Sequence, residues 1–180
     1  GMPEDGTVKL LSIGRFCVAK NFDNIPAICS FMVEQGMKLF RWYLIGFGSD
    51  EQLIRKKIEE YRMEDKVIIL GKKENPYPYI KSCDLYVQPS RYEGKCVAVT
   101  EAQILNKPVV ITDYPTANSQ LEDGVDGVIV SMNNKECAKG ITDLLHDPQR
   151  MKQLSKNCTE RDYTNACEVE KLYNLIDNCE

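Results

Sequence analysis

The sequence predicts an α/β fold, a doubly wound parallel sheet of about six strands with helices on both faces. Three observations lead to this prediction. Short apolar runs recur along the chain, segments with helical periodicity alternate with them, and three of the runs end in glycine. Nearly continuous apolar runs rich in β-branched residues are typical of strands buried on both faces. Strict alternation of strand and helix implies right-handed crossovers between parallel strands.

The expected elements follow one another in a regular order. Strands are predicted at 8–13, 42–45, 67–70, 85–87, 109–111 and 128–130. The first helix has apolar residues at the spacing of one helical face: Ile25, Ile28, Cys29, Met32 and Val33. Further helices are expected near 54–61, 96–105, 137–145, 148–161 and 168–177. This order is Rossmann-like, and residues 1–180 read as one domain without an internal repeat or linker.

Two local signals refine the helix starts. Ser49 and Gln52 have the spacing of a capping box, which would open the helix that carries Ile54, Ile58 and Tyr61 on its inner face. After the fourth strand, Pro89 breaks the chain, and a helix is expected from about Cys96.

Composition excludes several classes of function. The 180 residues can bury a real core, and the net charge of −4 with scattered Lys and Arg argues against nucleic-acid binding. No apolar run approaches the roughly 18 residues of a membrane span, and no signal peptide opens the chain. Gly1 and Met2 look like the remnant of a cleaved tag, so residues 1–6 are expected to be a disordered start and the chain a fragment.

Cysteine and histidine usage points to a cytosolic protein without a histidine-based site. The cysteines form no CxxC pair and lie at 17, 29, 83, 96, 137, 158, 167 and 179. Reduced thiols are therefore expected rather than a disulfide framework. The only histidine, His146, is predicted at a helix end, which argues against a zinc site or a hydrolase triad.

In doubly wound folds, ligands bind at the carboxyl ends of the strands. Gly14, Gly46 and Gly71 lie at three such ends, where glycine permits sharp turns and close approach of a ligand. Arg15 and Lys20 follow the first strand and could bind phosphate oxygens at that edge. Alternatively the glycines form tight turns and the two cations are solvated.

Glu93 and Glu101 are the most informative pair in the chain. Eight helical residues would span about 12 Å, with Glu93 at the mouth of the helix after the fourth strand. A ligand along this edge could give hydroxyl groups to both carboxylates while an anionic centre faced the helix N-terminus. A nucleotide sugar has that layout of sugar, diphosphate and ribose. Two solvated charges on a helix flank are the alternative.

Seven segments in order strengthen the first interpretation. They are Gly14-Arg15 with Lys20, Ile45-Gly46-Phe47-Gly48, Gly71, Pro89-Ser90 with Glu93-Gly94, Glu101-Ala102, Pro108 to Asp113, and Asp123 to Gly127. Together they resemble the C-terminal, donor-binding domain of GT-B glycosyltransferases, specifically glycosyltransferase family 4. The resemblance covers about residues 8–147. The stretch Ile111 to Thr116 is most similar to bacterial capsule and cell-surface polysaccharide enzymes.

The resemblance implies a role for each residue. Arg15 and Lys20 would bind the donor diphosphate and stabilise the leaving group. Backbone N–H groups of Gly94, Lys95, Cys96 and Val97 would hold the same phosphates. Glu101 would accept hydrogen bonds from the ribose. Glu93 would orient the sugar, while Gly71 and Lys72 would border the base, with Gly14 and Gly46 lining the site. The implied catalytic residues are Glu93, Arg15 and Lys20.

The resemblance of the glutamate pair also implies transfer with retention of anomeric configuration. It implies no metal or other cofactor, since GT-B enzymes do not need a metal, and the chain has no Asp-x-Asp element that would hold one. Some positions depart from the family pattern. Lys95 stands where phenylalanine is usual, Cys96 where a small residue or proline is usual, Asn21 where glycine is common, and Ser119 where an acidic residue is common.

If the chain is a fragment of a longer protein, its activity alone is expected to be limited. GT-B enzymes place the active site between two domains, so an N-terminal acceptor-binding domain would be missing. The chain is then expected to bind a nucleotide sugar weakly and transfer nothing by itself. Membrane contact, at the inner face, would belong to the absent domain. Exposed Tyr163 and Tyr173 would invite self-association.

Other functions stay open at this point. The same architecture could serve a nucleotide-sugar epimerase or a phosphorylase. A chain that has lost its activity could be a non-catalytic nucleotide-binding or interaction module, although the retained charges argue against this. A flavodoxin-like or receiver-like switch would need an acidic cluster after the first strand, where Arg15 stands instead.

Overall fold

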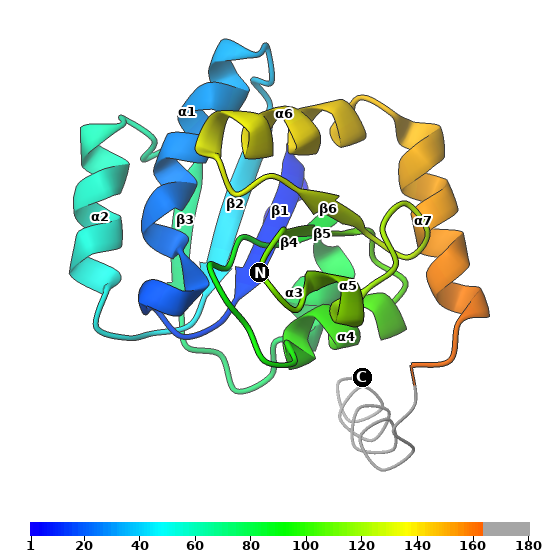
Figure 1. Ribbon diagram of the computed structural model, residues 1–180. Coiled ribbons are helices and arrows are strands. Elements are labelled where there is room, and N and C mark those ends of the chain that lie inside the picture. The colour runs from blue at the N-terminus through cyan, green and yellow to red at the C-terminus, as the bar shows by residue number, and fades with distance from the viewer. Residues whose placement is uncertain (164–180) are drawn as a thin grey trace.

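The computed structural model describes residues 1–163 and confirms the predicted fold class. A single six-stranded, all-parallel sheet has the order β3-β2-β1-β4-β5-β6 (Figure 1). The strands are β1 Val8–Ile13, β2 Phe40–Ile45, β3 Val67–Gly71, β4 Leu85–Gln88, β5 Val109–Thr112 and β6 Val128–Val130. Strand order reverses direction at β1, whose neighbours are β2 and β4. The carboxyl ends of β1 and β4 therefore form the switch point at which such sheets bind ligands.

Helices follow each strand. The α-helices are α1 Ile25–Glu34, α2 Glu51–Glu60, α3 Tyr77–Ser82, α4 Val97–Ile104, α5 Ala117–Gln120, α6 Asn134–Leu145 and α7 Pro148–Glu160. Two short 3₁₀ helices, η1 Val18–Lys20 and η2 Phe22–Asn24, fill the connection from β1 to α1. This connection reaches the carboxyl edge of the sheet and carries Arg15 and Lys20.

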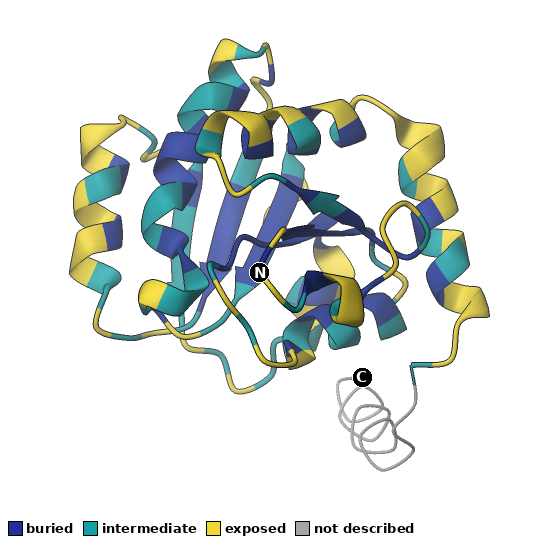
Figure 2. Ribbon diagram, in the orientation of Figure 1, coloured by how far each residue is buried: buried dark blue, intermediate teal, exposed yellow. Residues whose placement is uncertain are grey.

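Two apolar cores lie on the two faces of the sheet, so its strands are buried between helical layers (Figure 2). Side chains alternate between the faces, and Leu10 belongs to one core while Leu11 belongs to the other. The first core includes residues from α1, α2 and α6, and the second includes residues from α3, α4 and α5. Full burial of such a side chain contributes about 1.5–3 kcal/mol.

The ends of β1 and β2 pack backbone against backbone. At Gly46, with a φ of 148°, a Cβ atom would lie 1.8 Å from the carbonyl oxygen of Gly14. At Gly48 it would lie 2.4 Å from the carbonyl oxygen of Phe16. Both glycines are thus explained by the close approach of two chain segments, which fixes the loop that carries Arg15.

The predicted helices within residues 1–163 are present, but α3 and α5 were not predicted. Tyr61, expected on the inner face of the helix with Ile54 and Ile58, is exposed. Helix α4 begins at Val97, one residue after the expected start. The capping box at Ser49 and Gln52 is wrong, because α2 begins at Glu51 with Asp50 as its N-cap residue. The Ser49 hydroxyl lies 3.4 Å from the Asp50 carboxylate and caps no backbone group of the helix.

The first residues pack on the fold, in contrast to the disordered start expected for 1–6. The Met2 side chain is buried in the second core. Glu4 accepts a hydrogen bond of 2.6 Å from the Lys9 ammonium, and Asp5 pairs with Arg41. The buried apolar anchor and the two ion pairs hold this segment against β1 and β2.

Tyr163 and the cysteines can be compared with what the sequence predicts. Tyr163 is half-buried and donates a hydrogen bond of 2.9 Å to Asp126, which corrects its expected exposure. The helix expected at 168–177 and Tyr173 lie outside the described residues. The described cysteines are free thiols, as expected: Cys17, Cys29, Cys83, Cys96, Cys137 and Cys158.

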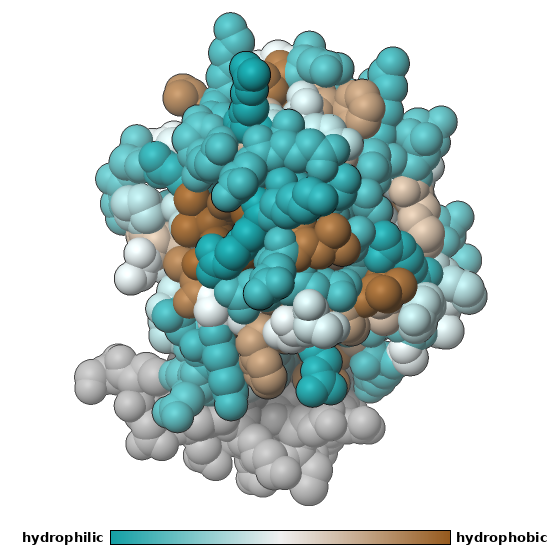
Figure 3. Space-filling view, turned by 90° about the vertical axis from the view of Figure 1, so that its left-hand side faces the viewer, coloured by the Kyte–Doolittle hydropathy of each residue, from teal (hydrophilic) through white to brown (hydrophobic). Residues whose placement is uncertain are grey.

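The side of the molecule that faces the viewer in Figure 3 is mostly hydrophilic. Figure 3 shows one side of the molecule, where apolar side chains are visible between polar and charged ones. Within residues 1–163, no helix combines the length and apolar character that a membrane crossing requires.

Candidate functional site

Two loops from neighbouring strands join at the carboxyl ends of β1 and β4. The Arg91 backbone N–H donates to the Ala19 carbonyl at 2.8 Å, and its guanidinium group pairs with Asp23 at 3.2 Å. The buried Asn21 side chain donates to the Pro89 carbonyl at 2.9 Å. The loop after β1 and the loop after β4 therefore form one connected unit.

Lys20 and Glu93 meet at the centre of this unit. The Lys20 ammonium lies 2.6 Å from Glu93 Oε1, and the two side chains are 20% and 8% exposed. Gly14 makes room for the lysine, since a Cβ atom there would lie 3.2 Å from the Lys20 stem. Two of the predicted catalytic residues thus form an ion pair at the predicted edge of the sheet.

Glu93 is held by further donors that the sequence analysis missed. The Ser90 hydroxyl donates to Glu93 Oε1 at 2.6 Å, and the Gln88 amide lies 3.4 Å from the same oxygen. Gln88 and Ser90 are fully buried. A glutamine at the end of an otherwise apolar strand was the signal that could have identified this network.

Asn21 explains how the loop after β1 tolerates a residue other than glycine. Its φ of 61° and ψ of 25° lie in the left-handed region, which asparagine enters more readily than most residues. The loop geometry, uncertain from the sequence, is therefore compatible with asparagine. The side chain adds the hydrogen bond to Pro89 that glycine could not make.

The N-terminus of α4 is partly occupied by protein groups. The Cys96 N–H donates to Gln120 Oε1 at 2.8 Å, and Thr116 donates to the Glu93 carbonyl at 2.8 Å. The Cys96 thiol is buried, and burial with the nearby Glu93 charge raises its pKa to about 11. Gly94, Lys95 and Val97 are exposed, and a Cβ atom at Gly94 would meet nothing within 4 Å. The residues of this N-terminus that a ligand could reach are therefore Gly94, Lys95 and Val97.

Glu101 lies on the second turn of α4 and contacts α3. The Tyr77 hydroxyl donates to Glu101 Oε1 at 3.0 Å. Burial, and then the charge of Glu101, raises the pKa of Tyr77 to about 12. Tyr77 was not predicted as a site residue, and it orients the second glutamate.

The other predicted residues lie at the same edge with fewer contacts. Arg15 is exposed, and no hydrogen bond or ion pair of its side chain is found within residues 1–163. The Lys72 ammonium lies 5.4 Å from the centre of the exposed Phe47 ring. Gly71 ends β3 with a φ of 74° and open space around it. No hydrogen bond or ion pair joins these residues to the Lys20–Glu93 pair within the described part of the chain.

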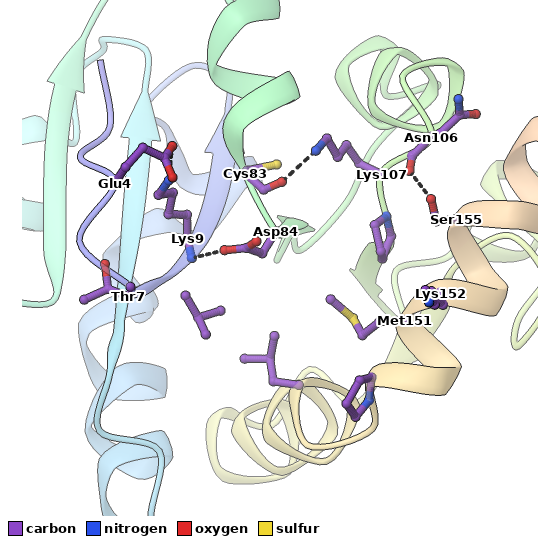
Figure 4. A pocket seen from close by; sticks show the side chains of 15 residues that line it. Glu4, Thr7, Lys9, Cys83, Asp84, Asn106, Lys107, Met151, Lys152 and Ser155 are labelled. Carbon is purple, nitrogen blue, oxygen red and sulfur yellow. Dashed lines mark hydrogen bonds and ion pairs between the residues drawn. The ribbon is translucent and has the colours of Figure 1, made fainter.

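A separate hollow of about 610 Å³ lies at the opposite, amino edge of the sheet (Figure 4). Two of its three lysines are already paired, Lys9 with Glu4 at 2.6 Å and Lys107 with the Cys83 carbonyl at 2.9 Å, while Lys152 is exposed. None of the predicted donor-binding residues line it. The edge with the Lys20–Glu93 pair is therefore the better candidate for a binding site.

The chain is similar to known glycosyltransferases. The sequence profile of the family described as glycosyl transferases group 1 matches residues 3–161. The amylovoran biosynthesis glycosyltransferase AmsD of Erwinia amylovora is 26% identical, over 89% of this chain and 44% of its own length. The poly(ribitol-phosphate) alpha-N-acetylglucosaminyltransferase of Staphylococcus aureus is 25% identical, over 92% of this chain and 34% of its own length.

A solved structure has the same fold. A variant of TarM from S. aureus, in complex with Fondaparinux, alpha-GlcNAc-glycerol and UDP, superposes with a TM-score of 0.81 at 25% identity. The match covers 97% of this chain and 37% of the TarM chain. The chain therefore spans less than half the length of these relatives.

Proposed function

We propose, on the premise that this chain belongs to the glycosyl transferases group 1 family, that it is the donor-binding domain of a glycosyltransferase. The full protein would transfer a sugar from a nucleoside-diphosphate sugar to an acceptor in the synthesis of a bacterial surface polysaccharide or glycoconjugate. The observation that carries the proposal is the Lys20–Glu93 pair at the switch point of the sheet, 2.6 Å apart and largely shielded from water.

Lys20 and Arg15 would receive the diphosphate. When the bond between the anomeric carbon and the diphosphate breaks, the electron pair stays with the leaving group, so negative charge builds on the phosphate oxygens. Cations and helix N–H groups that are already in place stabilise that charge without reorganising. Lysine is a mobile cation with three donors, so Lys20 can shift from Glu93 toward a phosphate oxygen.

The open end of α4 would hold the phosphates through backbone N–H groups near Gly94, Lys95 and Val97. Because the Cys96 N–H already donates to Gln120, its part in phosphate binding would require Gln120 to move. Glu101, oriented by Tyr77, would accept ribose hydroxyls. Gly71 and Lys72 at the end of β3 would border the base.

Glu93 would contact the transferred sugar through the oxygen that the network leaves available. We further propose retention of configuration and independence of metal, both implied by the resemblance of the glutamate pair to family 4. The anomeric configuration of the product, read by NMR, tests the first. Undiminished transfer by the full-length protein in excess chelator would support the second.

The acceptor would bind to a domain that this chain does not include, which agrees with a chain spanning less than half of its relatives. We therefore propose that the chain alone binds nucleotide and transfers no sugar, and that any membrane contact belongs to the other domain. Free thiols at every described cysteine are consistent with a reducing, cytoplasmic location.

Calorimetric titration with UDP, GDP and ADP tests the proposal. We expect one of the three to bind the wild type, and Lys20→Ala to weaken that binding. Lys56→Ala, on the exposed side of α2, serves as a matched loss of one positive charge and should leave binding unchanged. Equal weakening by both variants would mean that Lys20→Ala acts only through the net charge of the protein. Nucleotide binding that is unaffected by Lys20→Ala would contradict the assigned site.

A further inference from the structure

A chain of buried hydrogen bonds leads from the centre of the sheet to Glu93. The Tyr86 hydroxyl donates to Gln88 Oε1 at 2.7 Å, and the Gln88 amide donates to the Ser90 hydroxyl at 3.0 Å. Ser90 then donates to Glu93 Oε1 at 2.6 Å. Tyr86, Gln88 and Ser90 have no exposed surface. Every donor in this series therefore points toward the carboxylate.

Tyr86 sets the direction of the series. A glutamine side chain can turn over and exchange its oxygen and its NH₂ group, and only its hydrogen-bond partners decide between the two orientations. The Tyr86 hydroxyl also accepts from the Ile13 N–H at 3.2 Å, which ties it to the end of β1. Its proton can reach Gln88 Oε1 at 2.7 Å or the Ile13 carbonyl at 3.4 Å, and the shorter contact favours Gln88. The NH₂ group of Gln88 then faces Ser90 and Glu93.

The network solves a conflict in the site. Lys20 is the only cation paired with Glu93 in the described part of the chain, and the proposed function also requires Lys20 at the diphosphate. Were Lys20 the sole partner, its movement toward phosphate would release Glu93. Ser90 and Gln88 hold the same oxygen, Oε1, and can keep the carboxylate in place when Lys20 shifts.

We infer that Gln88, oriented by Tyr86, is a positioning residue that fixes Glu93 so that its second oxygen, Oε2, faces the sugar of the donor. The inference rests on the proposed function and adds to it the residues that hold the sugar-contacting carboxylate. Gln88 acts through Ser90 and Glu93 and does not itself contact the substrate.

The test compares a nucleotide with its sugar derivative, because Glu93 would contact only the sugar. Affinities are measured by calorimetry for UDP, UDP-glucose and UDP-N-acetylglucosamine, and for GDP and GDP-mannose. Gln88→Met keeps the length of the side chain and removes its amide. We expect the gain in affinity from the sugar to fall roughly tenfold, as for loss of a hydrogen bond to a charged group, with affinity for the nucleoside diphosphate unchanged.

Two further variants separate positioning from general damage to the fold. Gln103 is a fully buried glutamine on α4 whose amide donates to the Asp126 carbonyl at 2.9 Å, so Gln103→Met removes a comparable group outside the network. It should lower stability and leave the sugar increment intact. The double variant Tyr86→Phe with Gln88→Met should also lack the sugar increment, and because it removes the acceptor of the Ile13 N–H it should be no more stable than Gln88→Met.

Three outcomes would overturn the inference. Gln88→Met could leave the sugar increment unchanged, could weaken nucleotide and nucleotide sugar equally, or could be matched by Gln103→Met. Failure of the wild type to bind any nucleotide is a distinct result, since it would remove the proposed function and this inference with it.

Discussion

Two glycines of the proposed donor site have opposite surroundings, and this difference gives a sharp test of the structure. At Gly46 an added Cβ atom would lie 1.8 Å from the Gly14 carbonyl oxygen, and the φ of 148° strains any other residue. At Gly94 an added Cβ atom meets nothing within 4 Å, and no positive φ is found. Substitution by alanine should therefore act on stability at Gly46 and on ligand binding at Gly94.

The magnitudes follow from the two environments. Gly46→Ala combines overpacking of about 1–3 kcal/mol with backbone strain of about 1–3 kcal/mol, which gives a loss of about 2–6 kcal/mol. That is a large part of the roughly 5–15 kcal/mol that stabilises a folded domain. Gly94→Ala, on an exposed loop, should change the free energy of unfolding by less than about 0.5 kcal/mol.

Urea unfolding followed by circular dichroism measures both free energies. A nucleotide titration of Gly94→Ala completes the test, since the new methyl group would stand where the diphosphate approaches α4, and weaker binding is expected at unchanged stability. The reasoning fails if Gly46→Ala loses no more stability than Gly94→Ala. It also fails if Gly94→Ala binds nucleotide as tightly as the wild type.

Two more predictions concern binding and pH. Tyr77→Phe removes the hydrogen bond to Glu101, so nucleotide affinity measured by calorimetry should fall about threefold to tenfold. Tyr79→Phe on the same helix should leave that affinity unchanged. Equal effects of the two variants would contradict the role of Tyr77 in orienting Glu101. Burial raises the pKa of Cys83 and Cys137 to about 12 from 9.0, so above about pH 9 the unfolded chain loses thiol protons that the folded chain retains. The contribution of these thiols to stability should thus be level below pH 8 and fall from pH 9 toward pH 12, with a smaller fall in Cys137→Ala. A urea midpoint, measured in reductant, that rises between pH 9 and pH 12 would contradict this sign.

The fold could be predicted from the sequence because its strands are short apolar runs separated by helices, a local pattern that needs no knowledge of distant contacts. Residues such as Leu10 and Leu11 lie in adjacent positions and in opposite cores, as a strand buried on both faces requires. Element boundaries were accurate where proline or glycine punctuates the chain, as at Pro89. They failed at Ser49, because Asp50 is an equally suitable N-cap residue.

The site was predictable in part. Arg15, Lys20 and Glu93 were identified from charge and from their place after β1 and β4. Their partners were missed because hydrogen bonds between residues from different elements leave no periodic signal. Gln120 reaches Cys96 from another helix, and Tyr77 reaches Glu101 in the same way.

The glycines show how one residue type conceals several roles. All were expected to line a ligand site. Gly14 instead accommodates the Lys20 stem, and Gly46 accommodates the backbone of Gly14, the residue after β1. Only Gly71 and Gly94 face open space. The sequence shows only that a glycine has no side chain. The structure is needed to show which atoms fill the space that a side chain would take.

The most direct test of the central claim is to map where a nucleotide binds. Backbone amide signals of the ¹⁵N-labelled chain are followed by NMR during titration with the nucleoside diphosphate that binds in calorimetry. We predict the largest shifts at Lys20, Gly94, Lys95 and Val97, at the carboxyl edge of β1 and β4. Shifts concentrated around Lys9, Lys107 and Lys152, which line the hollow at the amino edge, would contradict it.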